Sequence, residues 1–227
     1  MTRDTVLVPD EQTLAAFRRG DNSEAARLAD SDVAQARAIG DRQAWVQGLC
    51  MLARVALREG NLAEVVARAE EAEQIAERSG DDRLRRMPLH LRAVAARMAG
   101  RYDEGRERYV QSIALNDSLG EAAMAAAEHR NLAYLEIRAG DTDRARELFA
   151  ESVRRFEELD VPTMSAYLIF DQATVAALDG DYPTASALLA TAQTQWDEQG
   201  VVPDPDDAAE IADLRRRLTE AGVTPGS

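Results

Sequence analysis

One column of side chains carries residue types that could bind or react, because Cys50, His90, Arg130 and Phe170 recur every 40 residues. A thiol beside an imidazole can act as a nucleophile with its base, and an arginine fork can hold a carboxylate or phosphate. No third residue obviously orients His90, and the chain contains no phosphate loop, nucleophile elbow or metal motif. We therefore expect a binding protein that is not an enzyme, with no catalytic residue, no metal and no cofactor.

Two rows of glycines fix the register of this column. The first row is Gly20, Gly60, Gly100, Gly140 and Gly180; the second is Gly40, Gly80, Gly120 and Gly200, with Asp160 in its remaining place. Most of these glycines are followed by Asp or Asn. Glycine can close a helix in the left-handed conformation, and Asp or Asn can cap the next helix. The rows therefore predict a repeat array of antiparallel helices, each of about 18 residues.

Apolar residues within each segment recur at three- and four-residue steps, as Leu62, Val65, Val66 and Ala69 do, and no window alternates as a strand would. The expected helices cover residues 11–19, 23–39, 42–59, 62–79, 82–99, 102–119, 121–139, 142–159, 162–179, 182–199 and 206–221. Pro88 should kink its helix or delay the start to about Met87. Gly48 occupies the matching place one repeat earlier.

Composition excludes several classes of partner. The net charge of −14 argues against binding to nucleic acid, which needs a basic surface. Cys50 is the only cysteine, so an internal disulfide cannot form. No apolar stretch is long enough to span a membrane, and the start lacks the apolar core of a signal peptide. We expect a cytoplasmic protein, a monomer or homodimer, with no membrane partner.

The repeat resembles the tetratricopeptide (TPR) repeat. The residues that carry the resemblance are Asn131-Leu132-Ala133 in a first helix, Gly140 at the turn, Ala145 with Phe149 in the second helix, and the small column Ala53, Ala93, Ala133 and Ala173. The resemblance implies an all-α fold, a TPR-like right-handed superhelix of antiparallel helix pairs (an α-solenoid). The spacing of 40 residues departs from the usual 34 and is similar to the longer units of bacterial signalling ATPases and peptide-sensing regulators.

The repeat register also predicts the domain organisation. We expect a flexible N-terminal arm over residues 1–9 and five helix-pair repeats over residues 10–200. A linker and a C-terminal capping helix follow over residues 201–221, since a polar helix after the last pair is typical of a terminal cap. Residues 222–227 should form a disordered tail.

In TPR proteins the first helix of each pair lines the concave groove, and this lets charge be assigned to a face. The segments 42–59, 82–99 and 121–139 hold ten arginines and five acids; the arginines are Arg42, Arg54, Arg58, Arg83, Arg85, Arg86, Arg92, Arg97, Arg130 and Arg138. The second helix over 62–79 holds five acids and two arginines. The groove is therefore expected to be basic and to favour an anionic ligand. Alternatively, these arginines pair with acids on neighbouring helices or lie in solvent.

The candidate binding residues follow from this face. They are Arg54, Arg58, His90, Arg97, Arg130, Asn131, Tyr134, Arg138, Tyr167 and Phe170. Asn131 beside Arg130 resembles part of the carboxylate clamp of some TPR proteins, although the lysines of that clamp have no counterpart. Tyr134, Tyr167 and Phe170 would give the groove an apolar end, or they pack between adjacent helices.

Three functions fit the sequence. The first is a non-enzymatic interaction module or scaffold that binds an acidic peptide or protein segment in its groove. The second is a sensor or enzyme accessory protein that binds an anionic metabolite in an enclosed pocket around His90, Arg130 and Tyr134. The third is a scaffold that associates with itself through the ends of the array.

Overall fold

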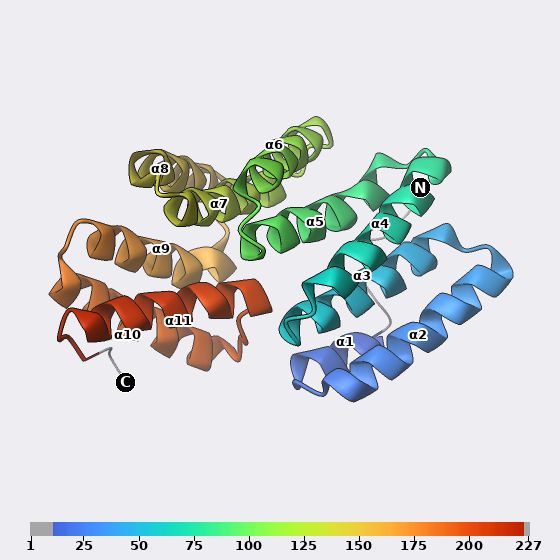
Figure 1. Cartoon of the computed structure of the whole chain (residues 1–227), viewed down its shortest axis with the longest axis horizontal. Coiled ribbons are helices and arrows are strands. Elements are labelled where there is room, and N and C mark those ends of the chain that lie inside the picture. The colour runs from blue at the N-terminus through green and yellow to red at the C-terminus, as the bar shows by residue number, and fades with distance from the viewer. Residues whose placement is uncertain (1–10, 225–227) are drawn as a thin grey trace. The chain divides into compact units, whose positions relative to one another are not determined.

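The computed structural model describes residues 11–224, and every regular element in that range is a helix (Figure 1). The α-helices are α1 (Glu11–Arg18), α2 (Asn22–Ile39), α3 (Arg42–Arg58), α4 (Leu62–Ser79), α5 (Arg86–Met98), α6 (Tyr102–Ser118), α7 (Ala122–Ala139), α8 (Thr142–Leu159), α9 (Ser165–Leu178), α10 (Tyr182–Gln199) and α11 (Pro205–Glu220). Two short 3₁₀ helices are η1 (Asp82–Arg85) and η2 (Pro162–Met164). The expected arm over residues 1–9 and the end of the expected tail, residues 225–227, lie outside the described residues.

The glycine rows end helices in the predicted way. Gly40 closes α2 at φ 76° and Gly140 closes α7 at φ 90°, both in the left-handed region. Asp160 takes the same conformation at φ 48° and is the only residue other than glycine with positive φ between residues 11 and 224. Asp tolerates this region better than most side chains. The aspartate that replaces a glycine in the second row therefore still closes its helix.

Pro88 and Gly48 both disfavour a helix, and they lie inside α5 and α3 for different reasons. Pro88 lies in the first turn of α5, which begins at Arg86 after the 3₁₀ helix η1, so the proline delays the α-helix as expected. Gly48 lies in the middle of α3, where a Cβ would stand 2.6 Å from Cγ2 of Val33 on α2. Glycine at this position allows the two helices to approach closely.

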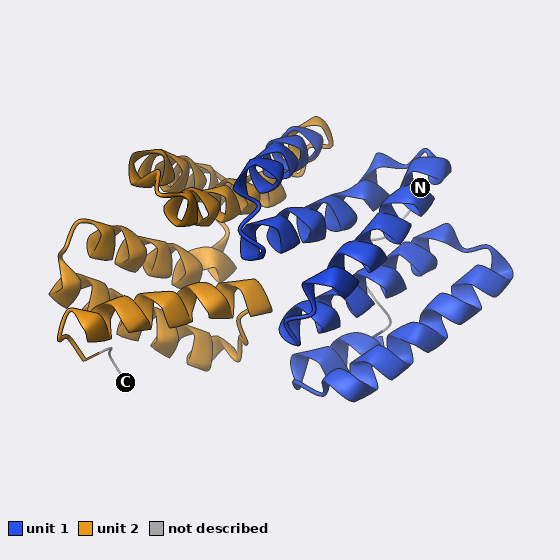
Figure 2. Cartoon of the chain, viewed as in Figure 1, with its two compact units in different colours: residues 1–115 blue, residues 116–227 orange. Residues whose placement is uncertain are grey.

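The chain divides into two compact units, residues 1–115 and 116–227, with the boundary inside α6 (Figure 2). In unit 1, α3 packs against α2 and α4, and α4 packs against α5. In unit 2, α7 packs against α8 and α9 against α10, while α11 lies beside α9 and α10 (Figure 1). The small column is buried in both units, since Ala53, Ala93, Ala133 and Ala173 have no exposed surface. Alanine there lets neighbouring helices pack closely.

Among residues 11–224, none of the helices combines the length and apolarity that crossing a membrane requires.

Candidate binding site on the first helices

Arg130 on α7 is the centre of the site in unit 2. Its Nε donates to both carboxylate oxygens of Asp171 on α9, at 2.8 and 3.0 Å. Its Nη1 donates to Oδ1 of Asp207 on α11 at 2.6 Å. Asp207 is 77 residues further along the chain. The buried guanidinium therefore joins two first helices to the C-terminal helix.

Aromatic rings enclose the same guanidinium. Its central carbon lies 4.9 Å from the ring centroid of Tyr134, 5.1 Å from that of Tyr167 and 5.9 Å from that of Phe170. The rings also contact each other: Tyr134 stacks on Phe170 at 5.9 Å, and Phe170 meets Trp196 at 5.8 Å. The three predicted aromatics thus pack between helices and, at the same time, against the predicted arginine.

Burial dominates the electrostatics of this cluster. Loss of hydration raises the pKa of Asp171 to about 6, because the charge of Arg130 and the hydrogen bond from the Tyr134 hydroxyl, 2.7 Å, offset it only in part. Burial alone would lower the pKa of Arg130, but the charges of Asp171 and Asp207 raise it well above its usual range. Arg130 therefore stays charged while Asp171 lies close to protonation.

Arg138 forms the second link between α7 and α11. Its Nε and Nη2 donate to the two oxygens of Glu210, at 3.0 and 3.1 Å, in the parallel geometry that suits a guanidinium and a carboxylate. The Arg138 side chain remains 31% exposed, whereas that of Glu210 is 6% exposed. Two of the predicted groove arginines are therefore bound to acids of α11.

In unit 1 the corresponding arginines meet an aromatic ring. Arg54 and Arg58 on α3 lie over Phe17 of α1, with their central carbons 4.5 and 3.7 Å from the ring centroid. Nη1 of Arg58 also donates to the carbonyl oxygen of Phe17 at 2.7 Å and to Oδ1 of Asn22 at 3.2 Å. Helix α1 thus covers this part of α3 as α11 covers part of α7.

The remaining predicted residues are Asn131, Arg97 and His90. Asn131 donates to Glu128 of its own helix at 3.3 Å. Arg97 is buried in α5, and His90 is half-buried in the same helix of unit 1. The structure therefore groups Arg130, Tyr134, Tyr167 and Phe170 in unit 2, with Arg138 joined through α11, and groups Arg54 with Arg58 in unit 1.

Cys50 is buried, and loss of hydration raises the pKa of its thiol to about 12. A nucleophilic cysteine must be a thiolate at working pH, so this environment opposes the thiol–imidazole chemistry that the column suggested. No group of three or more His, Cys, Asp or Glu side chains in the described part of the chain is arranged to hold a metal ion.

The sequence reasoning missed the partners of the arginines. Phe17, Asp171, Asp207 and Glu210 were absent from the expected site, although Asp171 shares a repeat position with Asn131 and follows Phe170. The register could thus have indicated Asp171. Asp207 and Glu210 lie beyond the last repeat, so the 40-residue spacing does not assign them to a face. Their contact with α7 could therefore not be predicted from the repeat pattern.

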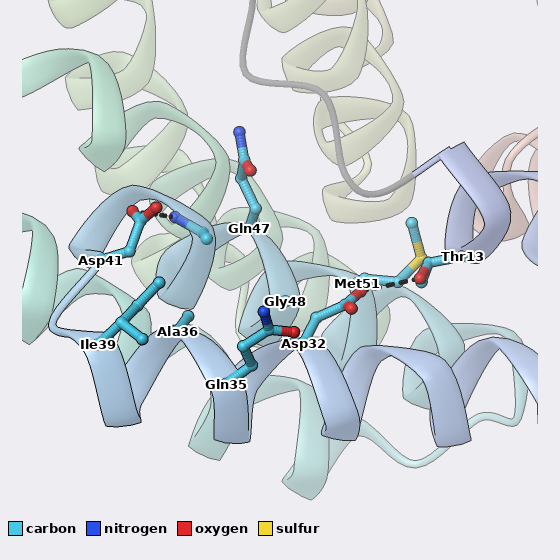
Figure 3. Close-up of a pocket in the computed structure, with 10 residues that line it drawn as sticks. Thr13, Asp32, Gln35, Ala36, Ile39, Asp41, Gln47, Gly48 and Met51 are labelled. Atoms are coloured by element: carbon cyan, nitrogen blue, oxygen red, sulfur yellow. Dashed lines mark hydrogen bonds between the residues drawn. The ribbon is translucent and has the colours of Figure 1, made fainter.

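A separate cavity lies between α1, α2 and α3 of unit 1 (Figure 3). Its volume is about 240 Å³, and its lining includes Gly48, Met51 and the hydrogen-bonded pair Thr13 and Asp32, 2.8 Å apart. Its lining contains none of the predicted binding residues.

No protein-family model and no curated protein matches the chain. Among solved structures it is similar to BtubC (BKLC) from P. vanneervenii, with a TM-score of 0.62, 21% identity, and coverage of 88% of this chain and 84% of that one. It is also similar to a Rap protein complexed with competence and sporulation factor, with a TM-score of 0.72, 16% identity and coverage of 92% of this chain. It spans only 60% of that Rap chain.

At sequence identities this low, the two structural similarities are evidence for the fold alone. Together with the sequential packing of the helix pairs, they define the class of protein: an all-α helical-repeat protein, or α-solenoid.

Proposed function

We propose that this protein is a non-enzymatic interaction module of the TPR type that binds an acidic peptide or protein segment on its first helices. One observation carries the proposal. Two arginines of α7, Arg130 and Arg138, each hold a carboxylate from a helix more than 70 residues away in the chain. This face therefore has the donors and the spacing that an acidic helical segment needs.

Two further observations support the proposal. One solved structure with a similar fold is a Rap protein complexed with competence and sporulation factor, so a fold of this kind can bind another molecule. The buried, protonated thiol of Cys50 gives no nucleophile at neutral pH. Binding without catalysis accounts for both.

The test is capture of partners from an extract of the cells that make the protein, followed by mass spectrometry. The informative variant is Arg138→Glu, because Arg138 is partly exposed and binds the carboxylate of Glu210. Circular dichroism verifies that the variant is folded. The matched control is Arg144→Glu on α8, where the arginine is exposed and pairs with Glu147 of its own helix. We expect wild type and control to retain an acidic protein that Arg138→Glu loses. Equal retention by all three would reject the binding face.

A further inference from the structure

We propose that α11 is an intramolecular ligand of the α7 arginines, so that the partner of this face is a helix of the same pattern that must displace α11. The inference rests on the proposed function and adds the chemistry and the regulation of its site. A capping helix needs to cover only the last pair, α9 and α10. Helix α11 also reaches α7, where Asp207 and Glu210 bind Arg130 and Arg138.

The contacting residues of α11 form one stripe. Asp207 and Glu210 are three residues apart, and the buried Ile211, Leu214 and Leu218 follow at helical spacing. Residues three and four apart share a face of a helix. The stripe is therefore an acid pair followed by an apolar ridge, and a competing helix would need the same order.

Two other acids of α11, Asp213 and Glu220, pair with arginines of the same helix. Asp213 pairs with Arg216 and Arg217, and Glu220 pairs with Arg216. The helix thus separates acids that stabilise it locally from acids that bind α7. Its two kinds of acid provide a matched pair of sites for substitution.

The connection to α10 makes α11 a strong competitor. Helix α10 ends at Gln199, and only the non-helical residues 200–204 precede α11. A tether this short corresponds to an effective concentration in the millimolar range. A free helix in solution must therefore compete with a high local concentration of α11. Replacing the acids of α11 that bind α7 should weaken the docking of α11 and so favour the free helix.

The experiment uses the full chain and a fluorescent peptide of residues 203–221. Binding is measured by fluorescence anisotropy for wild type, for the double variant Asp207→Asn/Glu210→Gln and for the control Glu220→Gln. We expect the double variant to bind the peptide at least tenfold more tightly than wild type, and the control to match wild type. Adding Arg138→Glu to the double variant should remove the gain.

Two results would overturn the inference: equal peptide affinity in wild type and the double variant, or a gain that survives Arg138→Glu. Circular dichroism verifies that the double variant is folded, and Asp207→Asn alone provides a milder substitution with the same expected direction. Hydrogen exchange gives an independent readout, since amides of α11 should exchange faster in the double variant than in Glu220→Gln.

The two proposals fail in different ways. Capture of a cellular partner together with unchanged peptide affinity would reject α11 as the intramolecular ligand and leave the proposed function standing. Tighter peptide binding in the double variant, with no acidic partner captured by any form of the protein, would reject the proposed function and retain the role of α11.

Discussion

Arg58 in unit 1 and Arg138 in unit 2 occupy the same repeat position, 80 residues apart, yet they are held by different chemistry. Arg58 lies over the ring of Phe17 and donates to neutral oxygens of Phe17 and Asn22. Arg138 donates to the carboxylate of Glu210. An aromatic ring and neutral oxygens hold Arg58, whereas a partly exposed ion pair holds Arg138, and another carboxylate could replace the one in that pair.

A second pair of equivalent positions shows the same contrast. Asp171, which binds Arg130, corresponds to Met51 three repeats earlier. Met51 belongs to an apolar cluster with Phe17 and Leu52. Unit 1 therefore has an apolar core where unit 2 has a buried charged pair, and the two units should respond differently to substitution, pH and salt.

The largest effect is expected at Arg130. Arg130→Met leaves Asp171 buried without its cation, and breaking a buried pair from one side costs about 3–5 kcal/mol of unfolding free energy. Urea denaturation measures this loss. The double variant Arg130→Met/Asp171→Leu should recover most of it, and an equally unstable double variant would contradict the assignment of the loss to the stranded carboxylate.

Asp171 should also make stability depend on pH. Its pKa is about 6 in the folded protein and about 3.9 in an unfolded chain, so between these values the folded state holds the extra proton. Its stabilising contribution is complete below about pH 4 and is lost as pH rises through 6, a change of about 2–3 kcal/mol. The free energy of unfolding is measured for wild type and Asp171→Asn at pH 4.5 and 7.5. The stability of wild type relative to the variant should fall between these two pH values. A difference that stays constant with pH would exclude this pKa.

The Phe17 ring should contribute to the free energy of unfolding because it packs against Arg54 and Arg58. Phe17→Leu keeps an apolar side chain but removes the ring below Arg54 and Arg58, and we expect a loss of about 1–2 kcal/mol from packing and cation–π contact. Thermal or urea unfolding gives the value. The same substitution with Arg58→Met already present should cost less, since part of the lost contact is then absent.

The smallest effects compare the two equivalent arginines directly. Arg138→Gln should cost less than about 1 kcal/mol, because its ion pair is partly exposed, and the cost should shrink at high salt. Arg58→Gln should cost about 1.5 kcal/mol with a smaller salt dependence, since Arg58 donates to the neutral oxygens of Phe17 and Asn22. Urea denaturation at about 0.05 M and 0.5 M salt tests both. Identical salt responses would contradict the distinction between Arg58, which is held by neutral groups, and Arg138, which is held by an ion pair.

Much of the fold was predictable because its signals are local. Helix ends at Gly40 and Gly140, and the delayed start near Pro88, follow from backbone conformation at single residues. The fit at Gly48 depends on Val33 of a neighbouring helix, whereas the repeat register indicated only that this glycine matches Pro88 of the next repeat. Local rules thus predicted the elements, and packing explained the exceptions.

The candidate site was predictable on one side only. The repeat register brought Arg130, Tyr134 and Phe170 to one face, and the structure places them in contact across α7 and α9. The same register could not identify Asp207, because residues after Gly200 follow no repeat. The arginines were therefore expected, and pairing with acids was kept as an alternative, but the particular acids that bind them were not identified.

The sequence by itself determined the helices, their punctuation and the face on which the arginines lie, because these depend on residues a few positions apart or on a fixed period. Only the tertiary structure decided what covers that face in each unit. A bond such as that between Arg138 and Glu210 joins residues 72 positions apart, and it depends on the direction in which α11 leaves a short non-helical connection. That direction is set by packing of the whole unit and by no local pattern.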